Sequence, residues 1–165
     1  LLNARLPTRN RLHRGGRVFR TVSPVPMGTR FKIEVANNVA CYTYLFGQES
    51  DGSTYVLFPY TKKHSPYCGI TGIRQFPKDH SLTVDDQGTK DVMAILVTNQ
   101  PFDYPSIQER MRESKVLGLE SGLPQVLGTE LLSADRPSYT EGETFGATAT
   151  ATANALAIIL QIDKQ

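Results

Sequence analysis

The sequence predicts a mainly β protein: an antiparallel, immunoglobulin-like β-sandwich with one or two short helices inserted before the last strand. Two aromatic-rich apolar runs, Cys41 to Phe46 and Thr54 to Tyr60, flank a polar loop that contains Asp51-Gly52, and this arrangement is typical of a β-hairpin. Arg30 to Val35 alternates charged and apolar side chains, which is the period of a strand. Val92 to Val97 is a continuous apolar run rich in β-branched residues, which favours a strand buried on both faces.

Composition is that of an ordinary globular domain. The 165 residues are 39% hydrophobic and 21% charged, so one domain with a sizeable core is expected. No apolar run is long enough to cross a membrane as a helix. The chain begins with Leu1 and lacks the apolar core of a signal peptide. We therefore expect a fragment or mature form of a longer protein.

Charge is concentrated at the amino-terminal end, where residues 1–33 hold seven Arg, one Lys and no acidic residue. Residues 1–16 show neither helical nor strand periodicity, and we interpret them as a basic flexible arm or linker. Residues 17–165 are then a single β-rich accessory domain. Guanidinium groups suit phosphate, but Phe19 alone leaves little for base stacking. We therefore do not expect nucleic acid to be a partner.

Shorter elements complete the sheets. Alternation predicts a strand from Arg17 to Val22, and Pro59 is expected to end the second hairpin strand or to place it at an edge. Residues 60–72 contain lysine, histidine, proline and glycine, and predict a surface loop. Ile73 to Phe76 and Leu82 to Val84 are expected to be short strands.

The carboxyl-terminal third should hold the helices and the closing strand. Ser106 and Glu109 match a capping box, which predicts a helix from about Ser106 to Val116 that ends at Gly118. Gln125 to Leu132 is a second, shorter helix candidate. A segment of alternating Thr and Ala then leads into an apolar run, which predicts a final strand that begins after Thr150 and pairs inside the sheet.

Several of these pieces together resemble a bacterial domain of unknown function. The resemblance covers about Met27 to Asp103 and rests on the order of Tyr42-Thr43-Tyr44-Leu45-Phe46, Asp51-Gly52 and Val56-Leu57-Phe58-Pro59. That family commonly lies downstream of caspase-like peptidase or kinase domains, or in envelope proteins. The resemblance implies an accessory module with no catalytic residues, and it favours the cell envelope or periplasm.

Tyrosines gather around the hairpin and the loop that follows it, where lysines and a histidine join them. Such side chains can bind a protein or a sugar ring, and they can also simply cover a sheet. The candidate binding residues are Tyr42, Tyr44, Tyr55, Tyr60, Lys62, Lys63, His64 and Tyr67.

Three chemical alternatives have weaker patterns. Cys68 with His64 or His80 could be a nucleophile and base, but their spacing does not secure hydrogen-bond reach. Cys41, His64, Cys68 and His80 could bind zinc, although they fit no common zinc framework. Asp79, Asp85, Asp86 and Asp91 could bind calcium, but aspartate at turns is usually structural. Cys41 and Cys68 could form one bridge in an oxidising compartment, and we favour two buried or half-buried thiols.

We therefore expect a module that is not an enzyme and uses no cofactor or metal. Its partner would be another protein or a neighbouring domain of the same polypeptide. Carbohydrate or cell-wall binding through the tyrosines is the alternative, and a cysteine-dependent hydrolase is a second alternative.

Overall fold

The computed structural model describes all residues except 1, 6–11, 38, 70–71, 141–143 and 149–153, and it is mainly β with two helices. One sheet has the order β12-β13-β1-β5-β9. Its strands are β1 (Leu2–Arg5), β5 (Ile33–Asn37), β9 (Gly72–Phe76), β12 (Ser138–Thr140) and β13 (Thr144–Thr148).

The larger sheet has the order β2-β3-β14-β11-β6-β7, and β8 pairs with the other end of β6. Its strands are β2 (Leu12–Gly15), β3 (Val18–Thr21), β6 (Cys41–Gln48), β7 (Thr54–Phe58), β8 (Tyr67–Cys68), β11 (Lys90–Thr98) and β14 (Ala155–Asp163). Here β3 and β14 pair in parallel, whereas the sequence predicts an antiparallel arrangement. A small ribbon joins β4 (Arg30–Phe31) to β10 (Leu82–Thr83).

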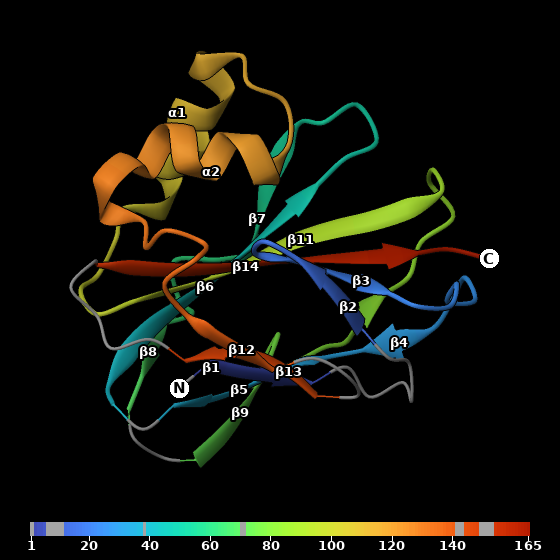
Figure 1. Ribbon diagram of the computed structural model, residues 1–165, viewed down its shortest axis with the longest axis horizontal. Coiled ribbons are helices and arrows are strands. Elements are labelled where there is room, and N and C mark those ends of the chain that lie inside the picture. Colours follow the sequence, from blue (N-terminus) through green and yellow to red (C-terminus); the bar gives the residue numbers. More distant parts are fainter. Residues whose placement is uncertain (1, 6–11, 38, 70–71, 141–143, 149–153) are drawn as a thin grey trace.

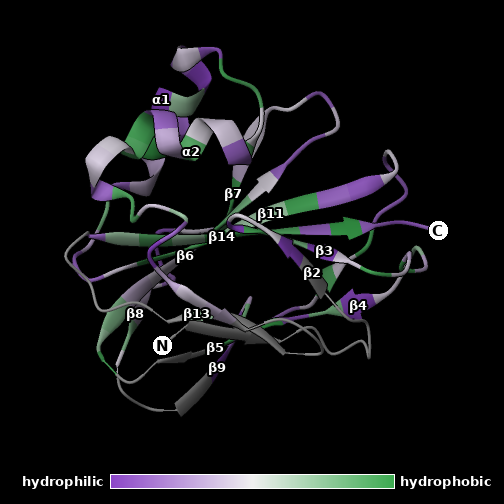
Figure 2. Cartoon of the chain, viewed as in Figure 1, coloured by the Kyte–Doolittle hydropathy of each residue, from purple (hydrophilic) through white to green (hydrophobic). Residues whose placement is uncertain are grey.

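The large sheet is the middle layer of the molecule (Figure 1). The other sheet lies on one side of it. Helices α1 (Tyr104–Ser114) and α2 (Leu119–Leu127), followed by a 3₁₀ turn at Gly128–Glu130, lie on the other side. Figure 2 shows hydrophobic segments along β11 and β14 in this middle layer.

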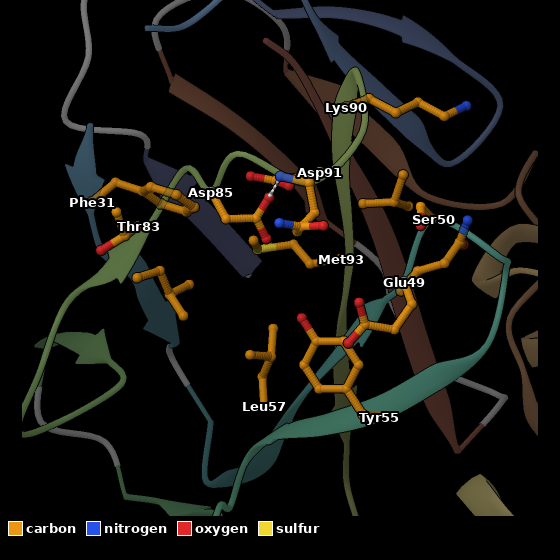
Figure 3. Close-up of a pocket in the computed structure, with 14 residues that line it drawn as sticks. Phe31, Glu49, Ser50, Tyr55, Leu57, Thr83, Asp85, Lys90, Asp91 and Met93 are labelled. Carbon is orange, nitrogen blue, oxygen red and sulfur yellow. Dashed lines mark hydrogen bonds between the residues drawn. The ribbon is translucent and has the colours of Figure 1, made fainter. Parts of the chain in front are cut away.

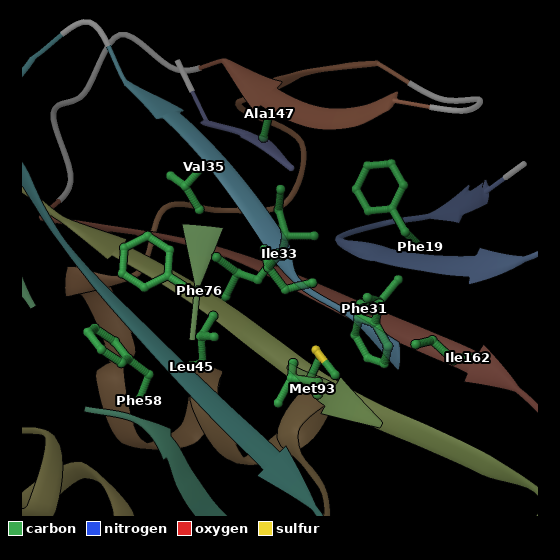
Figure 4. Packing of buried hydrophobic residues seen from close by; sticks show 14 of the residues in the cluster. Phe19, Phe31, Ile33, Val35, Leu45, Phe58, Phe76, Met93, Ala147 and Ile162 are labelled. Atoms are coloured by element: carbon green, nitrogen blue, oxygen red, sulfur yellow. The ribbon is translucent and has the colours of Figure 1, made fainter. Parts of the chain in front are cut away.

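Each face of the middle layer has its own hydrophobic core. Leu45, Ile95 and Ile158 belong to the core between the two sheets. Figure 4 shows Leu45 in this core with Ile33 and Phe76. Their neighbours in the chain point to the helices, because successive strand residues face opposite sides. This second set packs with Met111 and Leu123; it consists of Tyr44, Phe46, Ala94, Leu96, Ala157 and Ile159.

The hairpin and the buried strand are confirmed. β6 and β7 pair antiparallel, and the polar loop between them turns with Gly52 at φ 86°. β7 ends at Phe58, directly before Pro59, and is the last strand on its side of the sheet. β11 pairs with β6 on one side and with β14 on the other, and four consecutive residues, from Met93 to Leu96, are buried.

The described part of residues 1–16 contains two strands, although the sequence there shows no strand period. β1 pairs with β13 and β5, and β2 pairs with β3. The guanidinium of Arg14 lies 4.2 Å from the centre of the Tyr139 ring, a cation–π contact across the chain. β13 and β5 are remote in sequence from β1, so a local pattern could not reveal this pairing. The division of the chain into an arm and a domain stays a prediction.

The helical prediction is corrected in two details. The cap of α1 is Asp103, whose carboxylate accepts the Ser106 N–H at 3.2 Å, and not the expected Ser106 box. The second helix is Leu119–Leu127, several residues before the predicted range. Gly122 and Pro124 are poor helix formers, so the sequence of this segment does not look helical. The helix is stabilised instead by its buried leucines and Val126, which pack against the sheet. Both helices precede the final strand, with β12 and β13 in between.

Candidate functional site

The predicted tyrosines do not form one cluster. Tyr44 is fully buried under the helices, where its hydroxyl accepts the Phe102 N–H at 2.8 Å. Tyr42 is half-buried and meets the exposed Tyr67 edge-on, with ring centres 5.5 Å apart. Tyr44 is therefore a core residue, whereas Tyr67 presents its ring to solvent.

Tyr60 and His64 belong to a different group, which we call the Asp79 cluster: Tyr60, His64, Asp79 and His80. The Tyr60 hydroxyl donates to Asp79 Oδ1. His80 Nδ1 lies 2.8 Å from the same oxygen, and His64 Nε2 lies 3.7 Å from Oδ2. The centre of the Tyr60 ring lies 4.0 Å from that of the His64 ring and 5.0 Å from that of the His80 ring. One carboxylate thus organises three rings.

Two strand ends place this cluster. Tyr60 and His64 follow β7, and Asp79 and His80 follow β9, which ends at Phe76. The Phe58 and Phe76 rings that end these strands are in contact, with centres 4.9 Å apart and nearly perpendicular planes. Both phenylalanines are followed by prolines, so neither strand continues. The loops therefore leave the sheets side by side.

Hydrogen bonding and burial set the charge states of Asp79 and Tyr60. The Tyr60 hydroxyl and then His80 lower the pKa of Asp79 to about 2, so this carboxyl is ionised at neutral pH. Burial and the bond to Asp79 raise the pKa of Tyr60 to about 12, so its hydroxyl keeps its proton. The cluster therefore combines an anion with a fixed phenolic donor.

Three lysines flank residues of the Asp79 cluster in the sequence, namely Lys62, Lys63 and Lys78. Lys62 and Lys63 are exposed, and the backbone N–H of Lys63 donates to Thr61 Oγ1, which lies 2.7 Å from His64 Nδ1. Lys78 Nζ lies 5.6 Å from the centre of the Phe58 ring and donates to the Ser65 carbonyl at 3.3 Å. We call these lysines, the Asp79 cluster and Tyr67 the loop surface. It includes four predicted binding residues besides Tyr67, namely Tyr60, Lys62, Lys63 and His64.

Tyr55, the remaining predicted residue, lines a pocket of about 90 Å³ beside β11 (Figure 3). Leu57 and Met93 contribute apolar walls, and Asp85 and Asp91 contribute carboxylates. This volume is well below the roughly 300 Å³ of a typical small-molecule site. The pocket therefore suits small groups.

Lys164 forms ion pairs with both carboxylates. Its side chain is fully buried, and Nζ contacts Asp85, Asp91 at 2.5 Å and the Gln87 carbonyl at 2.7 Å. Burial alone would lower the pKa of Lys164, but the bonds to both aspartates raise it. Burial raises the pKa of Asp91 despite the lysine, and the lysine lowers the pKa of Asp85. The network joins the turn before β11 to the end of β14.

The metal-site alternatives separate in space. Cys41 pairs with Cys68, and the two histidines contact Asp79. Asp85 and Asp91 instead contact Lys164. Among the described residues, no group of three or more His, Cys, Asp or Glu side chains is arranged to hold a metal ion. In the same part of the chain, no helix is long and apolar enough to cross a membrane.

The features above define a mainly β domain with a helical layer and an aromatic, lysine-rimmed loop surface. Residues 25–101 match the model of a family described as "Domain of unknown function (DUF4384)". Comparisons with curated proteins and with solved structures each gave no match. The matched stretch runs from before β4 to just after β11 and contains the whole loop surface.

Asp79 and His80 are absent from the predicted binding residues. Asp79 is expected only as a turn-former or calcium ligand, and His80 only as a catalytic or zinc candidate. A Phe-Pro pair occurs twice in the sequence, at Phe58-Pro59 and at Phe76-Pro77. This repeat could have indicated that two strands end at neighbouring places. The residues that follow each pair are those of the cluster.

Proposed function

We propose that this chain is a non-catalytic accessory module that binds a protein, or a neighbouring domain of its own polypeptide, through the loop surface. One observation carries the proposal: the Asp79 carboxylate holds three rings in fixed contact on exposed loops. Preorganised rings lose little entropy on binding, and tyrosine is enriched where interfaces gain most of their energy.

The charges indicate the kind of partner. Lys62, Lys63 and Lys78 are exposed and lie beside His64 and Asp79 in the sequence, so a partner with acidic side chains would be attracted to this surface. Such exposed charges act over about 8–10 Å at physiological salt. Binding is therefore expected to weaken as salt is raised.

A sugar ligand is the second candidate, and Tyr67 is the observation that favours it. Tyr67 is 48% exposed and its ring contacts that of Tyr42, and an exposed aromatic ring can stack on a sugar. The third candidate, a cysteine hydrolase, has less support. The Cys68 side chain is fully buried, and its sulfur contacts Thr43 Oγ1 at 3.5 Å.

The wider setting belongs to the same proposal. The resemblance described above supports a bacterial, envelope-associated assembly. The immunoglobulin-like class of sandwich also stays a prediction: the common core of the two sheets supports a sandwich, while the parallel β3–β14 pair departs from an all-antiparallel one.

The test compares three immobilised baits in extract from the native organism. Wild type and Arg112→Ala, an exposed change on α1, should retain one protein in stoichiometric amount. The Lys62→Ala/Tyr67→Ala bait should lose it, and added salt should release it from wild type. Capture that is equal on all three baits would place the contact elsewhere. Retention of cell-wall glycan without protein would favour the second candidate.

A further inference from the structure

The structure brings two thiols of distant origin together under the loop surface. Cys41 begins β6, Cys68 ends β8, and they are direct partners in the antiparallel pairing of these strands. Both side chains point into the core between the sheets. A side-chain hydrogen bond joins the two thiols.

We propose that Cys41 and Cys68 form a reversible disulfide that fastens β8, and with it the loop from Tyr60 to Tyr67, to the middle sheet. This inference goes beyond the proposed function and does not depend on it. The opposed positions on paired strands and the shared burial of the two side chains carry it.

The backbone geometry permits the bond. Thr43 N–H donates to the Pro66 carbonyl at 2.9 Å, so the alternation of an antiparallel ladder makes Cys41 and Cys68 a hydrogen-bonded pair as well. Such a pair has Cα atoms about 5.5 Å apart, inside the range of about 4.4–6.8 Å found in disulfides. The Cβ atoms must approach by roughly 1 Å. Because β8 is only two residues long, a small shift of that strand suffices.

The pKa values of the two thiols shift in opposite directions, which determines the thiol that reacts first. The hydrogen bond from Cys41 lowers the pKa of Cys68 against the effect of burial, and Thr43, Arg74 and Lys78 lower it further. The same contact and burial raise the pKa of Cys41. Cys68 is therefore the first to form a thiolate, which is the attacking species in thiol–disulfide exchange.

The reaction needs a small disulfide as oxidant, such as oxidised glutathione. The Cys68 thiolate attacks one sulfur of the oxidant, whose S–S bond breaks and releases one thiolate. Cys41 then loses its proton, and its sulfur attacks Cys68, which releases the second thiolate. Two protein thiols are oxidised, one disulfide is reduced to two thiols, and the two protons end on these products. Because both cysteines are buried, β8 must open for the first attack.

The experiment exposes the full chain to oxidised glutathione, quenches with acid, and alkylates under denaturing conditions. The intact mass should show the loss of two hydrogens and no alkyl group, and reduction should restore two alkylation sites. Digestion should yield a peptide pair linked through Cys41 and Cys68. Amide exchange of residues 61–68 should be slower in the oxidised form.

A matched variant checks the order of attack. Cys41→Ala should stop at a mixed disulfide between Cys68 and glutathione, whereas Cys68→Ala should keep an alkylatable Cys41. Two alkyl groups on the oxidant-treated wild type would overturn the proposal. So would a glutathione adduct without an internal bridge, or a bridge between two chains on a non-reducing gel. These wild-type results hold even if a variant fails to fold.

Discussion

Gly47 shows how one missing side chain positions another. A Cβ atom at this position would lie 2.3 Å from the Tyr55 ring, which crosses the strand there. The Tyr55 ring lies over β6 only because Gly47 has no side chain. This explains a glycine inside a strand that is rich in aromatic and apolar residues, where its low β propensity is a cost.

Gly47→Ala should therefore destabilise the protein by about 1 kcal/mol, because the ring of Tyr55 must swing toward solvent. Urea unfolding measures this change. In a Tyr55→Ala background the same substitution should cost much less, which gives a coupling of about 0.5–1 kcal/mol in a double-mutant cycle. Gly15→Ala, where no atom lies within 4 Å, is the control. If Gly47→Ala destabilises the wild type and the Tyr55→Ala variant equally, the contact between Gly47 and the Tyr55 ring has no effect on stability.

Asp79 gives a prediction with a pH signature. Its pKa is lowered to about 2 in the folded protein, against about 3.9 for an unperturbed aspartate. Its bonds to Tyr60 and His80 therefore stabilise the fold above about pH 4, and this stabilisation is lost as the pH falls through about 2. Asp79→Asn should be less stable than wild type at neutral pH, and the difference should shrink over that window.

Urea midpoints of the two proteins across the acidic range measure this difference. Asp86→Asn, an exposed change on the turn after β10, is the control for loss of an aspartate, and its difference from wild type should vary less. A constant gap between Asp79→Asn and wild type would show that the carboxylate stabilises nothing through its charge.

At the scale of elements, Lys164 ties the end of β14 to the turn before β11. Replacement by Met removes the ammonium and leaves Asp91, which is 18% exposed, beside Asp85. Breaking a buried ion pair costs several kcal/mol, but Asp85 is half-exposed, so about 2 kcal/mol is expected for Lys164→Met. Lys90→Met, an exposed lysine near the same pocket, should change stability by under about 0.5 kcal/mol.

Chemical denaturation at neutral pH compares the two variants. On acidification the deficit of Lys164→Met should narrow, because the pKa of Asp91 is already raised by burial and its carboxyl can take up a proton. Similar stability of the Lys164→Met and Lys90→Met variants would mean that the network carries no net energy.

Elements with a strong local period are the ones that the sequence predicts well. Alternation gives Phe31, Ile33 and Val35, all buried, and the apolar run gives β11 with its two buried faces. Elements that depend on distant partners are missed. β1 and β2 pair with distant strands and show no alternation of their own. The apolar pattern of α2 is hard to recognise in the sequence because Gly122 and Pro124, two poor helix formers, interrupt it.

The site follows the same rule. The sequence predicts four residues of the loop surface because they follow the hairpin directly: Tyr60, Lys62, Lys63 and His64. The sequence does not predict Asp79 as the centre of a cluster, because its partner Tyr60 lies nineteen residues earlier. The two residues follow strands of different sheets. The core position of Tyr44 also depends on the helices, which come from the far end of the chain.

At the scale of the whole molecule, the middle sheet serves two cores at once. β11 gives Ile95 to the core between the sheets, and Ala94 and Leu96 to the core under the helices. Loss of either outer layer would uncover a continuous apolar face. The three layers are therefore expected to unfold together, because each outer layer stabilises the middle sheet on which the other outer layer packs.

This interdependence bears on the stretch that matches the family, residues 25–101. β14 pairs with β11 along nine residue pairs and lies outside that stretch, as do both helices and β3. A fragment of residues 25–101 would thus expose the helix-facing side and one edge of β11 to water, and would keep only β5 and β9 of the other large sheet over the opposite face. We expect it to lack dispersed amide signals in NMR spectra and a cooperative urea transition, while the full chain has both.

The control joins two complementary pieces, residues 1–101 and residues 102–165. Separately, neither should give dispersed signals, because the first lacks β14 and the second lacks β11. Mixed in equal amounts, they should recover the dispersion of the intact chain, since the β11–β14 ladder and the helix–sheet core can form between them. A cooperative transition of residues 25–101 alone would show that the matched stretch closes its own core, and that the helices and β14 are additions to a complete domain.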